Sequence, residues 1–150
     1  IDVIKECLLP LTRVLTPNIP EAEILVGRKI VGECDFFVVA KELSTYYGVS
    51  VLLKAGHLSG NTLTDYFYNV ENDSLTLLPS MRVNTKNTHG TGCTLSSAFA
   101  AALAKGNDLT YAAKLAKKYI EQAIIAGAEY EIGHGHGPVN HFFEFEKNNR

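Results

Sequence analysis

The amino-acid sequence predicts an α/β fold, and three features of the chain carry that prediction. The run at 49–54 is almost wholly apolar, as is typical of a strand buried in a βαβ layer. A helical period of apolar residues precedes this run, and two more helical periods follow a glycine-rich motif near residue 90. At 150 residues the chain has the length of one domain, so we take 1–150 as part of a single domain.

The first half of the chain is expected to begin with a strand. Residues 11–16 form a β-branched run that ends at Pro17. Pro20 marks the start of a helix, with two glutamates in its first turn. A second helix is predicted from Glu33 to Gly48, because apolar residues recur on one face and glycine is a common helix stop. That inward face consists of Phe36, Val39, Ala40, Leu43 and Tyr47.

The second half is expected to contain a hairpin and two helices. Residues 65–70 and 74–78 are predicted strands joined by the polar turn 71–73, forming a flap or an edge hairpin. A helix is predicted over 94–105, with Gly106 as its stop and Leu95, Phe99, Ala102 and Leu103 facing inward. Asp108 is a good N-cap for the next helix. Its predicted inward positions are Leu109, Ala112, Ala116, Tyr119, Ile120, Ala123 and Ile124.

The composition excludes several classes of protein. Basic residues are neither in excess nor clustered, and the net charge is −2, which argues against nucleic-acid binding. The longest apolar stretches are too short to span a bilayer. Three widely spaced cysteines without a C-x-x-C pair argue against a disulfide framework or zinc site, and favour a reducing, cytoplasmic setting. The chain begins at Ile1 and its one methionine is Met81, so we expect it to be a piece of a longer chain.

The motif Gly90, Thr91, Gly92, Cys93 stands directly before a run of small, helix-compatible residues. Backbone N–H groups at a helix N-terminus attract phosphate, and glycines let the phosphate approach the backbone closely. Cys93 would lie in the first helical turn, where the pKa of its thiol should be lowered, so that the thiolate can act as a general base. No Walker A motif is present. The alternative is a glycine turn whose cysteine merely packs.

Two further segments carry candidate ligands. Asn18 and Glu21 follow a predicted strand, where an amide and a carboxylate can hold the water shell of Mg²⁺; the alternative is a proline turn with Glu21 as a helix-start charge. Lys54 leaves the buried strand into the Gly56-His57 turn, well placed to reach a phosphate, or is simply a surface lysine. The loop histidines His134 and His136 lack zinc-site spacing, which favours a structural or substrate-lining loop.

Taken in order, these segments resemble the ribokinase-like small-molecule kinases, and most closely the hydroxymethylpyrimidine/phosphomethylpyrimidine kinases of thiamine biosynthesis. The resemblance runs from about Val14 to Phe142. It rests on TPNIPEAEIL (16–25), VLLKAGHLSG (51–60), RVNTKNTHGTGCTLSSAFAAALAKG (82–106) and GHGPVNHF (135–142). It implies a three-layer α/β/α sandwich, of which this chain would be the C-terminal, nucleotide- and phosphoryl-binding portion.

The resemblance also implies roles for single residues. The anion hole that receives the transferred phosphoryl group corresponds to Gly90, Thr91, Gly92 and Cys93. Most ribokinase relatives carry an aspartate base at the position of Cys93, and a cysteine is typical of the pyrimidine kinase branch. Asn18 and Glu21 match a pair associated with Mg²⁺ and phosphate, and Lys54 matches a lysine that contacts ATP phosphates. The nucleotide is expected to be bordered by Thr85, Thr88 and Val139.

The implied activity is the ATP- and Mg²⁺-dependent phosphorylation of hydroxymethylpyrimidine, and then of its monophosphate to the diphosphate. The N-terminal portion that forms much of the pyrimidine site in this family is absent from the chain. We therefore expect the chain alone not to turn over, and its incomplete sheet to expose an apolar edge. Relatives often dimerise, so a homodimer is an assembly to test.

Three other functions remain open at this point. A sibling kinase for pyridoxal or hydroxyethylthiazole would share the glycine anion hole, although His89, Cys93 and the GHGPVNHF tail favour the pyrimidine branch. A non-catalytic nucleotide- or pyrimidine-binding sensor would need no base, which the set Asn18, Glu21, Lys54 and Cys93 argues against. A cysteine-dependent redox or hydrolytic enzyme ranks last, because no resolving cysteine or persuasive histidine partner is evident.

Overall fold

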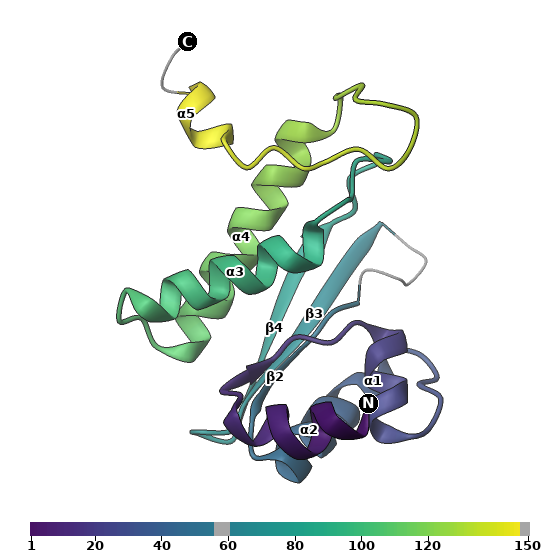
Figure 1. The fold of residues 1–150 in the computed structure, drawn as a ribbon, viewed down its shortest axis with the longest axis vertical. Helices are drawn as coiled ribbons and strands as arrows, with labels where there is room; N and C mark the ends of the chain where they lie inside the picture. The colour runs from purple at the N-terminus through teal and green to yellow at the C-terminus, as the bar shows by residue number, and fades with distance from the viewer. Residues whose placement is uncertain (56–60, 148–150) are drawn as a thin grey trace. The chain divides into compact units, whose positions relative to one another are not determined.

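A computed structural model describes residues 1–55 and 61–147 (Figure 1). The chain forms two compact units, Ile1–Met81 and Arg82–Arg150, which we describe separately. Gly56 and His57 of the predicted lysine turn lie outside the described residues, as does the rest of 56–60.

The first unit is built around a mixed sheet with strand order β1-β2-β3-β4. Its elements are the π-helix Ile4–Leu8, the 3-10 helix Leu9–Leu11, β1 (Val14–Leu15), α1 (Ile19–Val26), α2 (Cys34–Tyr47), β2 (Ser50–Leu53), β3 (Thr62–Asn69) and β4 (Ser74–Met81). β1 and β2 are parallel, and the two later pairings are antiparallel. The expected βαβ layer is therefore present, with α1 and α2 in the connection between β1 and β2.

The predicted first strand is mostly wrong, because only Val14 and Leu15 of 11–16 form a strand. Pro10 lies at the start of the 3-10 helix, where its missing N–H costs nothing. The Thr12 hydroxyl donates to the carbonyl of Leu8 at 2.9 Å, which ties the preceding turn to the residue after it. This local hydrogen bonding competes with strand formation in a segment whose β-branched residues predict a strand.

The apolar core of the first unit lies between α2 and the sheet. α2 packs on β2 and β3, and α1 packs on α2. The predicted inward face is confirmed for Phe36, Val39, Ala40 and Leu43, which are buried, while Tyr47 is half-buried. The Phe36 ring meets the Tyr66 ring edge-on, with centroids 5.4 Å apart. The helix ends where predicted, since Gly48 adopts the left-handed conformation with φ 68°.

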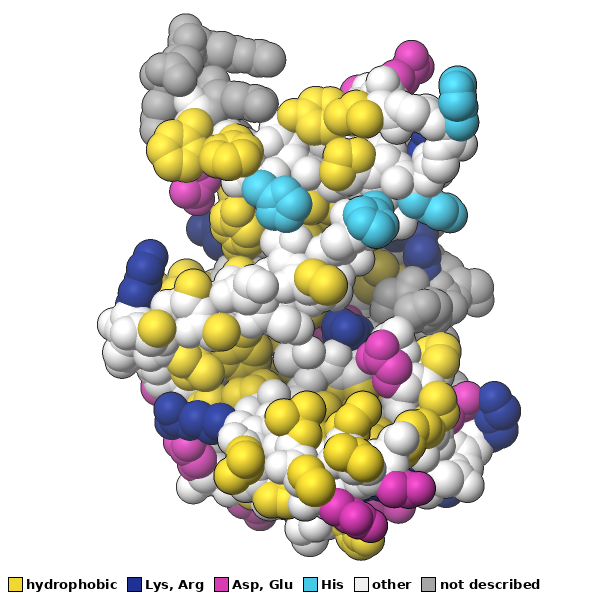
Figure 2. Space-filling view, viewed as in Figure 1, with side chains coloured by type: hydrophobic (Ala, Val, Ile, Leu, Met, Phe, Trp, Pro, Cys, Tyr) yellow, Lys and Arg dark blue, Asp and Glu magenta, His cyan; other side chains and the backbone are white. Residues whose placement is uncertain are grey.

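The predicted hairpin is confirmed at the edge of the sheet, with strands longer than expected. β3 and β4 pair from Thr62 with Met81 to Asn69 with Ser74. Apolar side chains are exposed on the N-terminal segment, which is not part of the sheet, and on the edge strand β4. Figure 2 shows hydrophobic side chains over the N-terminal segment. The exposed apolar residues of that segment are Ile1, Val3, Ile4, Leu8 and Leu11.

A polar cluster fastens the tip of the hairpin to α2. The Tyr68 hydroxyl donates a hydrogen bond to Asp73 Oδ1, and Lys41 Nζ lies 3.5 Å from the same oxygen and 5.7 Å from the Tyr68 ring centroid. The hydrogen bond from Tyr68 and the charge of Lys41 lower the pKa of the Asp73 carboxyl. The same cluster raises the pKa of Tyr68, chiefly through its bond to Asp73, and that of Lys41, chiefly through Tyr68.

This cluster predicts a pH-dependent stability. The pKa of Asp73 is lower in the folded state than in the unfolded chain, so its contribution is complete above the unfolded value of about 4 and is lost as the pH falls through the folded value. The difference in unfolding midpoint between wild type and Asp73→Asn should therefore be present at pH 7 and shrink steadily below pH ~4. Denaturant unfolding across this range, with Glu129→Gln as the exposed control, checks it. A difference that stays constant down to pH ~2 would contradict the assignment.

The regular elements of the second unit, over its described residues, are helices. Its elements are α3 (Thr91–Ala104), α4 (Leu109–Gly127) and α5 (Phe143–Lys147). α3 and α4 pack along one another and are joined by a short turn, in which Gly106 has φ 86° (Figure 1). Asp108 caps α4 as predicted, accepting a hydrogen bond from the N–H of Tyr111 at 2.8 Å. No helix in the described ranges is long and apolar enough to cross a membrane.

The inward faces of α3 and α4 are confirmed with three exceptions. Leu95, Phe99 and Ala102 of α3 are buried, as are the predicted leucine, isoleucine and alanines of α4 up to Ala123. Leu103, Tyr119 and Ile124 are only half-buried, since they flank the contact between the helices. α3 also begins three residues before the predicted start, because the helix includes Thr91, Gly92 and Cys93.

Candidate functional site

In the first unit, two predicted site residues meet at the carboxyl ends of the parallel strands. The N–H of Lys54 donates to the carbonyl of Pro17 at 2.9 Å, and Asn18 pairs with Lys54 as an isolated parallel bridge. The pairing of β1 with β2 is thereby extended past both strand ends. Carboxyl ends of parallel strands are where ligands collect in open α/β sheets. Lys54 itself is half-buried.

Asn18 and Glu21 form a capping box at the start of α1. Asn18 Oδ1 accepts from the N–H of Glu21 at 2.8 Å, and Glu21 Oε2 accepts from the N–H of Asn18 at 2.8 Å. From the sequence, the two residues were expected to hold Mg²⁺ or to lie in a proline turn with Glu21 as a helix-start charge, and the box was not predicted. The signal was present, since a capping residue followed three positions later by Glu is the sequence signature of this motif. The box uses one oxygen of Glu21, and within the described residues its Oε1 accepts no hydrogen bond.

Asp65 is a buried carboxylate beside this site that the sequence analysis placed only in a strand. It is 4% exposed, and its Oδ1 accepts from the N–H of Ala55 at 2.8 Å. Ala55 directly follows Lys54, so Asp65 fixes the backbone where it leaves β2. An acidic residue that stands between a threonine and three aromatic residues of β3 was the signal that marked it, because such a residue is rarely buried without a partner.

In the second unit, the predicted glycine motif forms an uncapped helix start. Gly90 is the N-cap of α3 in the left-handed conformation, with φ 83°, which only glycine adopts readily. No side chain caps this helix, whereas Asn18 and Asp108 cap α1 and α4. Within the described residues, the N–H groups of Gly92 and Cys93 donate no hydrogen bond to the protein. Donors of this kind at a helix N-terminus are suited to bind an anion.

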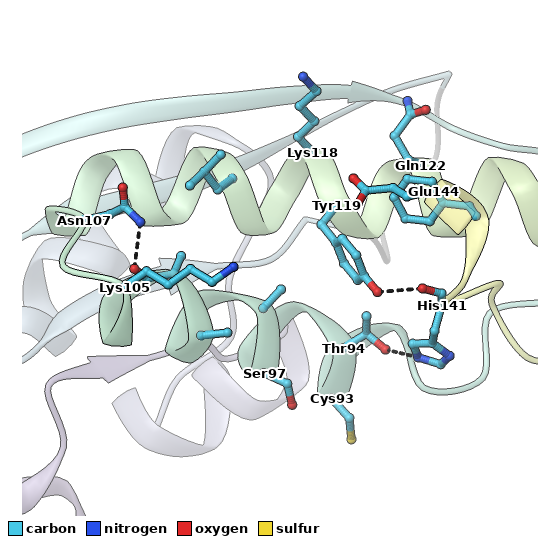
Figure 3. A pocket seen from close by; sticks show the side chains of 15 residues that line it. Cys93, Thr94, Ser97, Lys105, Asn107, Lys118, Tyr119, Gln122, His141 and Glu144 are labelled. Carbon is cyan, nitrogen blue, oxygen red and sulfur yellow. Dashed lines mark hydrogen bonds between the residues drawn. The ribbon is translucent and has the colours of Figure 1, made fainter. Parts of the chain in front are cut away.

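Cys93 is the third residue of α3, and it is exposed. The thiol does not pack within the described residues, which favours the predicted role at the anion-binding turn over a cysteine that merely packs. Cys93 and Thr94 lie at one end of a groove of about 790 Å³ between α3, α4 and the C-terminal segment (Figure 3). At that end, the Thr94 hydroxyl and His141 Nε2 are 2.9 Å apart, and the Cys93 thiol projects from another side of the same turn.

Thr85 and Val139 meet at the C-terminal end of α4. The Thr85 hydroxyl donates to the carbonyl of Ala128 at 2.9 Å. The Val139 backbone lies close to Gly127, because a β-carbon added to Gly127 would be 3.2 Å from the carbonyl carbon of Val139. The side chain of Val139 is 3% exposed. Thr88 is exposed and precedes the anion-binding turn, with its carbonyl accepting from the N–H of Thr91 at 3.3 Å.

Asn87 holds this end of the second unit together, a role that the sequence analysis missed. It is 1% exposed, and its Nδ2 donates to three carbonyl groups at or just beyond the end of α4, at 2.8 to 3.2 Å. Carbonyls at the end of a helix lack partners in the helix, so the amide of Asn87, which is distant in sequence, caps the C-terminal end of α4. The C-terminal loop packs on the same side chain, and the N–H of His89 donates to the carbonyl of Gly137 at 3.0 Å. In that loop, the exposed His136 has its Nδ1 3.2 Å from the carbonyl of Lys86.

A family model and several known kinases match most of the chain. The family model described as phosphomethylpyrimidine kinase matches residues 1–140. The chain is 47% identical to the hydroxymethylpyrimidine/phosphomethylpyrimidine kinase of Rhizobium meliloti over 143 residues, which cover 95% of the chain and 53% of that protein. It is 42% identical over 146 residues to a thiamine biosynthesis bifunctional protein of Geobacter sulfurreducens, covering 97% of the chain and 29% of that protein.

A solved structure, an ADP complex of Bacillus subtilis pyridoxal kinase, matches with a TM-score of 0.85 and 32% identity. The match covers 96% of the chain and 53% of that structure, so the chain spans about half the length of the kinases it matches. This likeness confirms the predicted ribokinase-like kinase fold, in the partial form that the sequence indicated. From the family match over most of its length, we conclude that the chain belongs to the phosphomethylpyrimidine kinase family.

Proposed function

We propose that the full-length protein transfers a phosphoryl group from ATP to hydroxymethylpyrimidine, and then a second one to the resulting monophosphate. The observation that carries the proposal is the start of α3, where the N–H groups of Gly92 and Cys93 are unbonded within the described residues beside an exposed thiol. Donors for a phosphoryl oxygen and a group that can accept a hydroxyl proton are thus adjacent in sequence. A site that only binds a phosphate needs the donors but not the thiol.

The two steps place different demands on Cys93. In the first, the substrate hydroxyl oxygen attacks the γ-phosphorus, the bond from that phosphorus to the ADP oxygen breaks, and Cys93 in its thiolate form accepts the hydroxyl proton. In the second, the attacking oxygen belongs to a phosphate that is already ionised near pH 7. The N–H groups of Gly92 and Cys93 serve both steps, because both place negative charge on the transferred group.

ATP and Mg²⁺ are the partners that this chemistry requires. Lys54 would meet the ATP phosphates as a point charge, and Thr85, Thr88 and Val139 would border the nucleotide. Glu21 and Asn18 would hold Mg²⁺ through its water shell, and the open Glu21 Oε1 fits this role, because Mg²⁺ keeps several waters and takes few carboxylates. When bound, Mg²⁺ offsets the charge of the phosphates.

Glu21→Gln separates the metal role from the capping role. Glutamine keeps an oxygen that can accept from the N–H of Asn18, so the free energy of unfolding should change by less than ~0.5 kcal/mol. Loss of the carboxylate should raise the Mg²⁺ concentration for half-maximal activity about tenfold. Glu21→Ala removes both roles and should show both effects. If Glu21→Gln leaves the Mg²⁺ concentration for half-maximal activity unchanged, Glu21 has no role in metal binding and acts only in the capping box with Asn18.

The substrate is the part of the proposal with a close competitor. Relatives named for pyrimidine kinase activity and for thiamine biosynthesis favour the pyrimidine, whereas a similar structure is that of a pyridoxal kinase. Specificity constants for hydroxymethylpyrimidine, its monophosphate, pyridoxal and hydroxyethylthiazole, measured with one full-length preparation, decide between them. We expect both pyrimidines to be preferred. A higher kcat/KM for pyridoxal or the thiazole would assign the chain to a sibling branch.

The wider setting of the enzyme follows from the same proposal. The chain would form the C-terminal, nucleotide- and phosphoryl-binding portion of one kinase domain that acts on small molecules in the cytoplasm. A homodimer is the assembly to test, by light scattering of the full-length protein. A monomer over the working concentration range would remove that part of the proposal.

A further inference from the structure

The first turn of α3 follows His89, whose N–H is bonded to the carbonyl of Gly137, and few hydrogen bonds within the described residues hold the turn itself. It has no side-chain cap, and its own backbone supplies the bonds from the N–H of Thr91 to Thr88 and from the N–H of Thr94 to Gly90, at 3.3 and 2.9 Å. Thr94 is the first buried residue of the helix. The contact between its hydroxyl and His141 Nε2, at 2.9 Å, is the side-chain hydrogen bond that joins this turn to another segment within the described residues.

His141 is held firmly at the other side of that contact. Its carbonyl accepts from the Tyr119 hydroxyl of α4 at 2.9 Å. The preceding residue, Asn140, donates its N–H to the carbonyl of Ala123 at 3.0 Å, and its Oδ1 accepts from the N–H of Phe142 at 2.9 Å. Figure 3 shows the ring reaching from this anchored segment to Thr94. His141 therefore connects α4, which its carbonyl contacts, to the first turn of α3, which its imidazole contacts.

We propose that His141 is a positioning residue for phosphoryl transfer, acting through Thr94 on the turn that carries Gly92 and Cys93. The proposal rests on the function proposed above. Within the described residues, the imidazole makes no hydrogen bond to the thiol or to the N–H groups of Gly92 and Cys93. It fixes the residue that follows Cys93, and small displacements of a reacting group are costly in rate.

A double-mutant cycle in the full-length enzyme tests this coupling. His141→Phe keeps a ring without the nitrogen, and Thr94→Val keeps the shape without the hydroxyl. Each should lower kcat of the first phosphorylation about tenfold, as the loss of one hydrogen bond allows, and the double variant should be within about twofold of the worse single variant. Matched controls are His141→Gln and Thr94→Ser, which keep a hydrogen-bonding group and should recover most of the rate.

A second readout does not depend on activity. All three cysteines are exposed, so their alkylation rates can be followed peptide by peptide, with Cys7 and Cys34 as internal controls. Both single variants should change the rate at Cys93 about threefold or more in the same direction and leave the other two thiols unchanged.

The outcomes separate this proposal from the function. If wild type phosphorylates none of the candidate alcohols, the proposed function fails, while the alkylation rates still test the contact. Single-variant effects that multiply in the double variant, or kcat values and Cys93 alkylation rates within about twofold of wild type, would overturn the role of His141. A failure of the glutamine and serine variants to recover the rate would overturn it as well.

Discussion

Replacing Cys93 with alanine should lower kcat of the first phosphorylation by about 100- to 1,000-fold, which is the contribution typical of a general base. The second phosphorylation should fall by less than ~10-fold, because an ionised phosphate oxygen needs no base. The N–H groups of residues 92 and 93 remain in the variant, so they still stabilise the negative charge on the transferred phosphoryl group. The asymmetry between the two steps, rather than the loss itself, identifies Cys93 as a base.

The chain offers a matched control for this variant. Cys34 is also exposed and stands in the first turn of a helix, α2. Cys34→Ala should leave both steps within about twofold of wild type, so a general effect of removing an exposed helix-start thiol can be set aside. Initial rates with hydroxymethylpyrimidine and with its monophosphate, each at saturating ATP, supply the comparison. Equal losses in both steps of Cys93→Ala would contradict the role of a base.

Replacing Gly137 with alanine should destabilise the protein by about 2 to 3 kcal/mol, in the upper range for overpacking a close-packed site. A β-carbon at this position would lie 2.0 Å from Asn87 Oδ1 and 2.7 Å from its Cγ. The Asn87 side chain cannot move aside at low cost, since its Nδ2 donates to three carbonyls at the end of α4. Relief of the clash would break that cap or displace the loop.

Gly135 provides the control, because it lies two residues away in the same loop and a β-carbon there would meet nothing within 4 Å. Gly135→Ala should change the free energy of unfolding by less than ~0.5 kcal/mol. Thermal unfolding of both variants beside wild type makes the comparison. Similar stabilities for the two variants would mean that Asn87 does not hold the loop as described.

The sequence predicted most of the fold because the relevant signals are local. The apolar period of α2 and the left-handed Gly48 defined that helix, and Asp108 marked the start of α4. The strand at 11–16 was overestimated, since β propensity could not reveal that Pro10 and Thr12 favour a 3-10 turn before it. Such competition depends on hydrogen bonds that the residue pattern does not display.

The candidate site was predictable in part, for a similar reason. The uncapped start of α3 follows from the absence of a capping side chain before Thr91, and the capping box of Asn18 and Glu21 has a spacing that can be identified in the sequence. Asn87 and His141 act on segments about 40 to 50 residues away, on the end of α4 and the first turn of α3. No local pattern shows such contacts, so their roles emerge from the structure.

The most direct test of the account is the mass of the products that the full-length protein forms from hydroxymethylpyrimidine, ATP and Mg²⁺. We expect the monophosphate of hydroxymethylpyrimidine to appear first and its diphosphate second, with one ATP consumed for each phosphoryl group added. Binding of the pyrimidine without consumption of ATP or gain in mass would contradict it, and would leave the chain as part of a sensor.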